Sequence, residues 1–223
     1  MSLKILAPVF AIEALFLFGC GMLGSDSESS RALVFDQATL YMAELDEVPV
    51  EGVLVPGVSG KGLSLSEGQS ASLDIVLNDS IPVGTVEFWF KPGEDFFDGA
   101  PRTLLGNDGS RIHFFVKNDE LIFQKNHTGV HYFVKGLLDL DSGWNLIAGQ
   151  WGNDSLSLAV NGKVIASIPH SFGYVPSTRF TDDSNRILIG IKSSCCMEAL
   201  LQYESLSTSG AFDQVRVSNK VRY

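Results

Sequence analysis

The fold class follows from Gly210-Ala211-Phe212-Asp213-Gln214-Val215-Arg216-Val217-Ser218, near the end of the 223-residue sequence. Apolar and polar residues alternate along this stretch, which predicts a β-strand with one buried face. Other short apolar runs, separated by Gly, Asn, Asp and Ser, recur from about residue 33 onward, and none has a long helical period. This pattern predicts an all-β sandwich or jelly roll.

Two short turns support this prediction. Asn161-Gly162 separates the apolar runs 156–160 and 163–167. Asn-Gly tolerates the positive φ angles of a type I′ turn, so this pair predicts a two-residue β-hairpin. Asn118-Asp119 separates two further runs and can turn the chain in the same way.

Five segments, taken in chain order, resemble the laminin G-like, concanavalin A-like jelly-roll domains. They are Gly60–Leu65, Gly84–Pro92, the block Trp144–Trp151 with Leu156–Lys163, Arg186–Gly190 and the closing strand Gly210–Ser218. In the closing strand, Phe212 and Gln214 stand where the family usually has Ile and Glu. The resemblance implies one two-sheet antiparallel jelly-roll domain over residues 33–223, with a role in recognition or adhesion.

The first residues have the layout of an export signal. One cation, Lys4, precedes an apolar run, and Leu17-Phe18-Gly19-Cys20 resembles a bacterial lipobox in which Phe18 is unusual. We predict a signal peptide over residues 1–19, lipid attachment at Cys20 and a flexible tether over residues 20–32. An ordinary cleaved signal and an uncleaved anchor are the alternatives. The predicted location is the cell envelope, with the protein held at the membrane.

The remaining cysteines, Cys195 and Cys196, are adjacent in the sequence. In an exported domain they can close a strained disulfide or stay reduced. Metal binding is disfavoured, because a Cys-Cys pair lacks the Cys-x-x-Cys spacing and no histidine is close in the sequence.

The charge balance argues against one class of partner. Sixteen basic and 26 acidic residues give a formal net charge of −10. An acidic protein repels phosphate backbones, so nucleic acid is not an expected partner.

The sequence also lacks the catalytic pattern that the resemblance would bring with it. Glucanases of this superfamily carry Glu-x-Asp-x-Glu or Glu-x-Asp-x-x-Glu on one strand, so that two carboxyl groups share a cleft. The nearest string, Glu44-Leu45-Asp46-Glu47-Val48-Pro49, lacks the second Glu at either spacing. Asp139 and Asp141 are followed by a turn signal, Ser142-Gly143. We interpret both sets as loop acids and predict no catalytic residue.

The resemblance raises the question of calcium, because many relatives hold this ion with carboxylates and backbone carbonyls. Asp36, near the start of the domain, and Asp213, in the closing strand, are the candidate ligands. The alternative is structural, with Asp213 as a hydrogen-bonding residue and Asp36 as a turn residue. No other cofactor is expected.

Sugar binding needs exposed aromatic rings and converging polar groups. The three tryptophans, Trp89, Trp144 and Trp151, fall in the family's strand motifs, so we expect most of them to pack in the core. Candidate ligand-binding residues are therefore Tyr132 and, in the long loop 169–183, Phe172 and Tyr174.

The sequence thus predicts a non-catalytic binding module at the bacterial cell envelope that recognises a glycan or a cell-surface protein. The alternative is a structural subunit of a surface assembly, and a glycoside hydrolase-like enzyme is the less favoured third interpretation.

Overall fold

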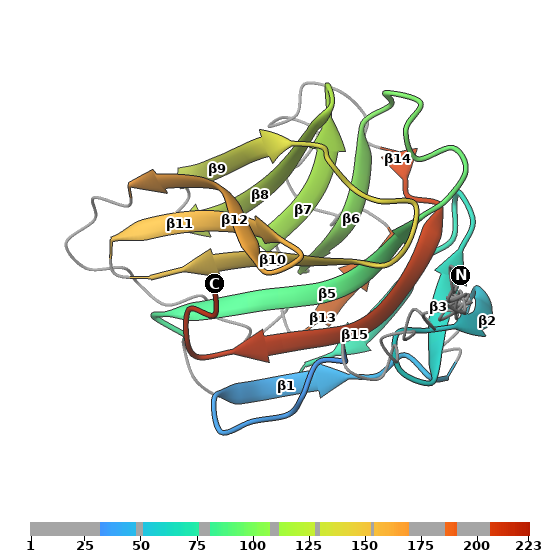
Figure 1. Cartoon of the computed structure of the whole chain (residues 1–223), viewed down its shortest axis with the longest axis horizontal. Coiled ribbons are helices and arrows are strands. Elements are labelled where there is room, and N and C mark those ends of the chain that lie inside the picture. The colour runs from blue at the N-terminus through green and yellow to red at the C-terminus, as the bar shows by residue number, and fades with distance from the viewer. Residues whose placement is uncertain are drawn as a thin grey trace, which may run out of the picture.

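The computed structural model describes residues 32–47, 51–75, 81–107, 112–127, 130–152, 154–169, 186–190 and 206–223. Every regular element in these ranges is a β-strand (Figure 1). The strands are β1 (Thr39–Ala43), β2 (Val53–Pro56), β3 (Lys61–Leu65), β4 (Ala71–Asp74), β5 (Gly84–Pro92), β6 (Arg102–Asn107), β7 (Ile112–Lys117), β8 (Glu120–His127), β9 (Val130–Leu137), β10 (Asn145–Trp151), β11 (Ser155–Val160), β12 (Lys163–Pro169), β13 (Arg186–Ile189), β14 (Leu206–Ser207) and β15 (Gly210–Ser218). No helix long and apolar enough to span a membrane occurs among these residues.

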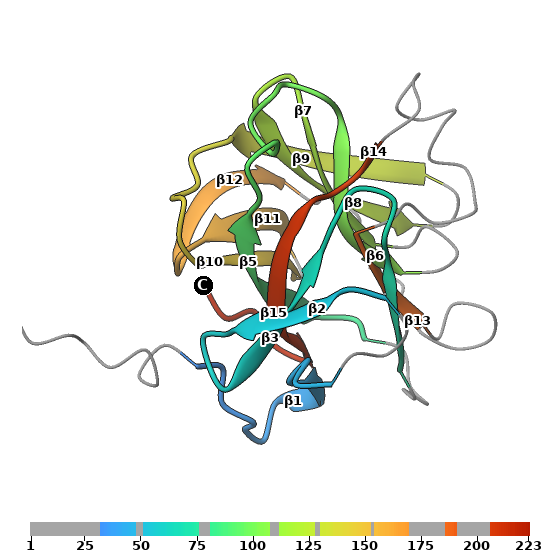
Figure 2. The same ribbon diagram turned by 90° about the vertical axis from the view of Figure 1, so that its right-hand side faces the viewer.

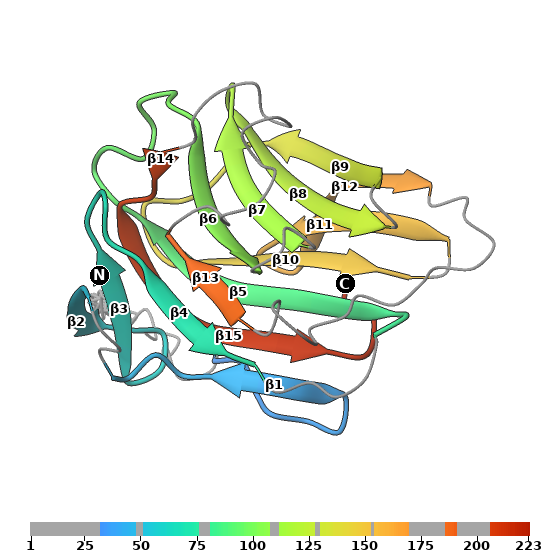
Figure 3. The same cartoon turned by 180° about the vertical axis from the view of Figure 1, so that it is seen from behind.

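The strands form two sheets that pack face to face (Figures 1 and 3). The first sheet has the order β12-β11-β10-β5-β15-β3-β2, with β1 also paired to β15. The second sheet has the order β4-β13-β6-β7-β8-β9, with β14 also paired to β6. The β14–β6 pair is parallel, and the other described pairs are antiparallel. The predicted two-sheet antiparallel sandwich is confirmed.

The main core lies between the two sheets and is rich in phenylalanine. Phe88 of β5 meets Phe114 of β7 edge-on, with ring centroids 5.1 Å apart. Phe114 in turn stacks on Phe123 of β8 at 4.8 Å. Such aromatic pairs add to the stability gained by burying their surface. Buried residues of this core include Phe88, Phe90, Leu158, Val160, Ile187, Ile189, Phe212, Val215 and Val217, whereas the buried Trp89 belongs to a separate cluster.

The predicted hairpin turn between β11 and β12 is present. Asn161 and Gly162 have φ angles of 50° and 79°, and Val160 pairs with Lys163 across the turn. Asn118 and Asp119, with φ angles of 51° and 59°, join β7 to β8 in the same manner. Both turns use residue types that accept the left-handed region at low cost.

The closing strand β15 organises one end of the molecule, where it lies beside β5, β1 and β3 (Figure 2). Its register shifts between Asp213 and Val215, and Gln214 in the bulge has a φ angle of 40°. The Gln214 amide accepts a hydrogen bond from the Leu33 backbone N–H at 2.7 Å and donates one to Glu44 Oε2 at 2.8 Å. The bulge therefore fastens the segment around β1 to the outer face of the first sheet.

Candidate functional site

The outer face of the first sheet carries a second, smaller apolar cluster, which we call the outer cluster. Leu33, Val58 and Trp89 are its buried members, and Met42, Trp144 and Leu146 pack against it while partly exposed. Trp89 stands between Phe88 and Phe90 on β5. Because side chains alternate across a strand, its ring faces away from the main core into which both neighbours point. The outer face would be expected to carry polar residues toward solvent, but at this place it is hydrophobic.

A hollow opens beside this cluster, and we call it the tryptophan pocket. It has a volume of about 460 Å³ and is lined by Trp89, Asp141, Trp144, Leu146, Asn161 and Gly162. Leu146 of β10 lies directly opposite Trp89 of β5 in the strand register, so both side chains belong to one face. Trp144 precedes β10 and approaches β3, since a Cβ added at Gly62 would stand 3.0 Å from Cη2 of its indole. Glycine at that position leaves room for the ring.

Two polar residues form the rim of the tryptophan pocket. Asn161 is exposed in the hairpin turn, and its Oδ1 accepts a hydrogen bond from the Leu146 backbone N–H at 2.9 Å. Asp141 is exposed in the loop before β10, and its backbone N–H donates to Asn145 Oδ1 at 3.0 Å. The Asn145 amide also donates to the carbonyl of Asp141 at 2.8 Å. The backbone at Asp141 is thus held in place, and its carboxylate faces solvent at the pocket.

One donor in the pocket wall has no partner among the described residues. Trp89 is only 6% exposed, and its indole Nε1 is buried without a hydrogen bond. By contrast, Nε1 of Trp151, which lies in the main core, donates to the Ile81 carbonyl at 2.9 Å. A buried N–H without an acceptor destabilises the free protein, and a ligand oxygen that reached it would remove that cost.

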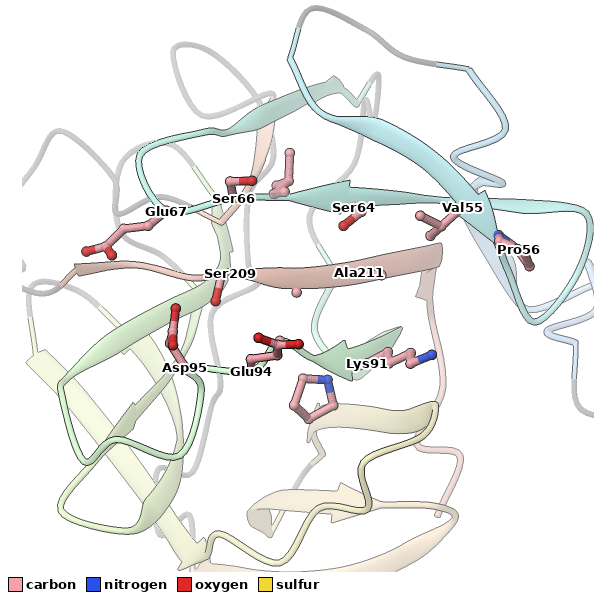
Figure 4. A pocket seen from close by; sticks show the side chains of 14 residues that line it. Val55, Pro56, Ser64, Ser66, Glu67, Lys91, Glu94, Asp95, Ser209 and Ala211 are labelled. Carbon is pink, nitrogen blue, oxygen red and sulfur yellow. The ribbon is translucent and has the colours of Figure 1, made fainter.

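A second hollow, the polar groove, lies on the same outer face nearer the end of β5 (Figure 4). Its volume is about 540 Å³. Ser64 of β3, Ala211 of β15 and Lys91 of β5 are paired in register across three strands and form its floor. Glu67, Glu94 and Asp95 line its sides. The small side chains of Ser64 and Ala211 leave the hollow, and its walls carry more negative than positive charge.

A buried carboxylate on β15 faces the strand that carries Trp89 of the tryptophan pocket. Asp213 of β15 is directly opposite Trp89 in the register, and it accepts hydrogen bonds from the backbone N–H groups of Val58 at 2.7 Å, Ser59 at 3.1 Å and Gln214 at 2.8 Å. Burial raises the pKa of Asp213 to about 6, although these donors act in the opposite direction. Asp213 fastens the turn after β2 to β15 and so holds Val58 in the outer cluster.

The two candidate calcium ligands are both engaged by nitrogen donors. Asp36 pairs with Arg222 at 2.9 Å and with Lys220 at 3.2 Å, and Arg222, the main cause, holds the pKa of Asp36 far below its usual range. Asp213 receives the three N–H groups described above. Within the described ranges, no group of three or more His, Cys, Asp or Glu side chains could hold a metal ion. The calcium site stays a prediction.

Of the predicted ligand-binding residues, only Tyr132 lies in the described part of the chain. It is on β9 of the second sheet, half-buried, and packs against the main core. It does not line either hollow. Phe172 and Tyr174, the lipid-attachment residue Cys20, and the pair Cys195 and Cys196 lie outside the described residues.

The acids interpreted as loop residues lie outside the described strands. Glu44 bonds to Gln214, and Asp46 Oδ1 accepts the Lys61 backbone N–H at 2.7 Å. Asp139 and Asp141 lie between β9 and β10. Asp141, interpreted from the sequence as a loop acid, nevertheless lines a pocket, and Trp89 and Trp144, which fall in motifs expected to pack mostly in the core, lie on the outer face. The alternation of Trp89 with two core phenylalanines was the available signal for its outward position.

Comparisons with known proteins agree with the architecture. A laminin G-type family model, described as the concanavalin A-like lectin/glucanases superfamily, matches residues 67–223, well over half of the chain. No protein with a curated description matches the sequence.

Among solved structures, the CBM40 carbohydrate-binding module of the Ruminococcus gnavus IT-sialidase, bound to α2,3-sialyllactose, is similar. The TM-score is 0.55 at 14% identity, and the alignment covers 82% of this chain and 93% of that one.

Two larger proteins also contain similar domains. The LG4-5 domains of mouse laminin α1 align with a TM-score of 0.51 at 15% identity, covering 70% of this chain and 40% of theirs. The binding domain of botulinum neurotoxin DC, in complex with rat synaptotagmin II, aligns with a TM-score of 0.54 at 12% identity. That alignment covers 82% of this chain and 43% of the other one. This chain thus spans less than half of each of these two. The family match and the two-sheet architecture lead to one conclusion: the chain belongs to the concanavalin A-like lectin/glucanases superfamily.

Proposed function

We propose that the protein is a non-catalytic binding module that recognises a carbohydrate at the tryptophan pocket. The observation that carries this proposal is the placement of two tryptophans, Trp89 and Trp144, on the outer face of a rigid sheet, with Asp141 and Asn161 at the rim. An apolar surface with a few fixed polar groups is the usual composition of a small-ligand site.

The chemistry of the pocket suits a sugar ring. A pyranose has C–H groups on its faces, which pack against an indole, and hydroxyl groups at its edge, which bond to a carboxylate or amide. Asp141 accepts hydrogen bonds, and Asn161 both donates and accepts. Trp144 is partly exposed, so its ring is the accessible platform, whereas the buried Trp89 forms the floor.

The solved relatives give further support at the level of function class. The Ruminococcus gnavus module is bound to sialyllactose, and the neurotoxin binding domains are found in complexes with synaptotagmin II and with SialylT. Each is a binding domain of a larger protein. At these low identities the likeness concerns the fold, so the choice of ligand for this chain depends on its own pocket.

The proposed location is the bacterial cell envelope, with a lipid on Cys20 that anchors the domain through the tether of residues 20–32. Several acyl chains together hold a protein firmly at a membrane. Cys20→Ser should therefore release the protein into the soluble fraction or block its processing. A Cys20→Ser protein that stays in the membrane fraction with unchanged mass would rule out the lipid anchor.

The experiment that tests the binding function compares Trp144→Ala with Phe35→Ala on a glycan array, using the full-length protein. Trp144 lines the pocket, whereas Phe35 is an equally aromatic, 65% exposed residue that lines neither hollow. We expect Trp144→Ala to lose the signals of wild type and Phe35→Ala to keep them, while circular dichroism shows that both variants are folded.

If the array shows no saturable signal for wild type, the carbohydrate proposal is wrong. Native mass spectrometry that then revealed a defined assembly would favour the alternative, a structural subunit of a surface assembly.

A further inference from the structure

We propose that the tryptophan pocket accepts an uncharged saccharide and discriminates against the same saccharide when it carries a sialic acid carboxylate or a sulfate ester. Asp141 is the residue that sets this preference. The inference rests on the proposed function, because it names the ligand class of the same site.

Among the described residues that line the pocket, one is charged. Of the six lining residues, Asp141 alone is ionisable, and it is a carboxylate exposed at the rim. A ligand carboxylate on Trp144 would face this group, and no lysine or arginine is among the described residues that line the pocket. Two like charges at short range repel, and the repulsion grows as a bound ligand displaces water from between them. A neutral hydroxyl at the same place instead donates a hydrogen bond to the Asp141 carboxylate, which is stronger than a bond between neutral groups.

The surroundings add to this negative potential. In the neighbouring polar groove, Glu67, Glu94 and Asp95 outnumber the single cation, Lys91. Asp213, whose pKa is about 6 because of its burial, lies opposite Trp89 and is mostly ionised at neutral pH. An anionic ligand on this face would therefore meet more negative than positive charge among the described residues of the two hollows.

The two arginines that the structure describes beside β5 on this face, Arg216 and Arg222, are already paired. Arg216 Nε lies 2.7 Å from Glu87 Oε1, and Arg222 Nε lies 3.2 Å from the same atom. Arg222 also pairs with Asp36 at 2.9 Å. The side chains of both arginines are less than a tenth exposed. They neutralise acids of this chain, and neither lines the tryptophan pocket. Proteins usually recognise a carboxylate or a sulfate with the paired N–H groups of an arginine guanidinium. Here the guanidinium groups of Arg216 and Arg222 instead bind Glu87 and Asp36 of the same chain.

This inference separates the chain from the Ruminococcus gnavus module, whose solved structures contain sialyllactose. The two share 14% identity, so a common fold does not carry the ligand preference from one to the other. Two tryptophans stand next to a rim carboxylate that has no hydrogen-bond or ion-pair partner among the described residues, and this arrangement favours the uncharged ligand.

The test uses the full-length protein on an array of matched glycan pairs, each printed with and without a terminal sialic acid or a sulfate ester, followed by titration of the best pair. Wild type is compared with Asp141→Asn, which keeps the side-chain shape, and with Asp139→Asn as a charge-matched control. Asp139 is exposed in the same loop but does not line the pocket. Circular dichroism confirms that each variant is folded.

We expect wild type to bind the uncharged member of a pair about tenfold more tightly or better. Asp141→Asn should reduce the ratio of the two dissociation constants, anionic to uncharged member, several-fold, chiefly by strengthening binding of the anionic member. Asp139→Asn should leave that ratio unchanged. Equal or tighter binding of the anionic member by wild type would overturn the inference while leaving carbohydrate binding intact. An equal reduction of the affinity ratio in Asp141→Asn and Asp139→Asn would overturn the role of Asp141. If no glycan of any pair gave a binding signal, the proposed function would be wrong, and the inference with it.

Discussion

Asn161 and Leu146 are joined by two reciprocal hydrogen bonds. The Asn161 side-chain Oδ1 accepts the Leu146 N–H at 2.9 Å, and the Asn161 backbone N–H donates to the Leu146 carbonyl at 2.8 Å. Asn161 Nδ2 also lies 3.3 Å from Asn145 Oδ1. The hairpin turn between β11 and β12 and the wall of the tryptophan pocket on β10 therefore form one unit. A residue that appears in the sequence only as a turn former also positions the site.

Asn161→Gly separates these two roles. Glycine accepts the positive φ angle of the turn but cannot make the side-chain hydrogen bonds, so we expect a loss of about 1–2 kcal/mol in the free energy of unfolding and weaker glycan binding. Urea denaturation and titration measure the two effects. Asn118→Gly, in the equivalent turn between β7 and β8, is the control and should change the affinity little. Identical effects of the two variants on binding would show that Asn161 has no special link to the pocket.

Trp89→Phe tests the unpaired indole N–H. The variant keeps an aromatic floor in the pocket but removes a buried donor that lacks a partner, so the loss of volume and the relief of an unsatisfied group partly cancel. We expect the free energy of unfolding to stay within about 1 kcal/mol of wild type and the affinity for the ligand to fall. Retention of full affinity would mean that the ligand does not use this donor.

A buried histidine predicts how stability depends on pH. His113 of β7 is fully buried, and this burial lowers its pKa to about 4 from the usual 6.5. The pKa in the folded state is depressed, so protonation favours unfolding: the full stability is present above pH 6.5 and is lost as the pH falls toward 4. Between pH 7 and pH 5 we expect His113 to account for a loss of about 2 kcal/mol.

Chemical denaturation of wild type and His113→Phe at both pH values checks this expectation. The variant should lose less stability over the same interval, with the remaining dependence arising from other groups, including His131, whose pKa is also lowered by burial. Equal losses in the two proteins would show that His113 is not the cause.

The fold could be predicted from the sequence because its signals are local. Alternation along Gly210–Ser218 and the Asn161-Gly162 turn each depend on residues adjacent in the chain, and the structure contains both features. The pocket depends instead on which strands become neighbours. Trp89 meets Leu146 because β5 pairs with β10, and it meets Asp213 because β15 pairs with β5 from the far end of the chain. No local pattern specifies these pairings.

The same reason explains why Asp141 and Trp144 were not predicted as site residues. Asp141 has the local sequence of a loop acid, and Trp144 stands in a motif whose other tryptophan, Trp151, does pack in the main core. Gly62 on β3, which is distant in sequence, leaves room for the Trp144 indole, because a Cβ at that position would stand 3.0 Å from its Cη2. Pockets on such a sheet are therefore identified from strand order and from the side chains on its outer face.

The most direct test of the account follows the indole N–H signals of the three tryptophans by nuclear magnetic resonance while the tightest-binding uncharged glycan is added. Trp89 and Trp144 line the pocket, whereas Trp151 is buried in the main core and bonded to the Ile81 carbonyl, so it serves as an internal control. The account predicts saturable shifts of the Trp89 and Trp144 signals with the Trp151 signal nearly unmoved. Saturable binding that leaves the Trp89 and Trp144 signals in place would contradict it, because the ligand would then bind elsewhere on the protein.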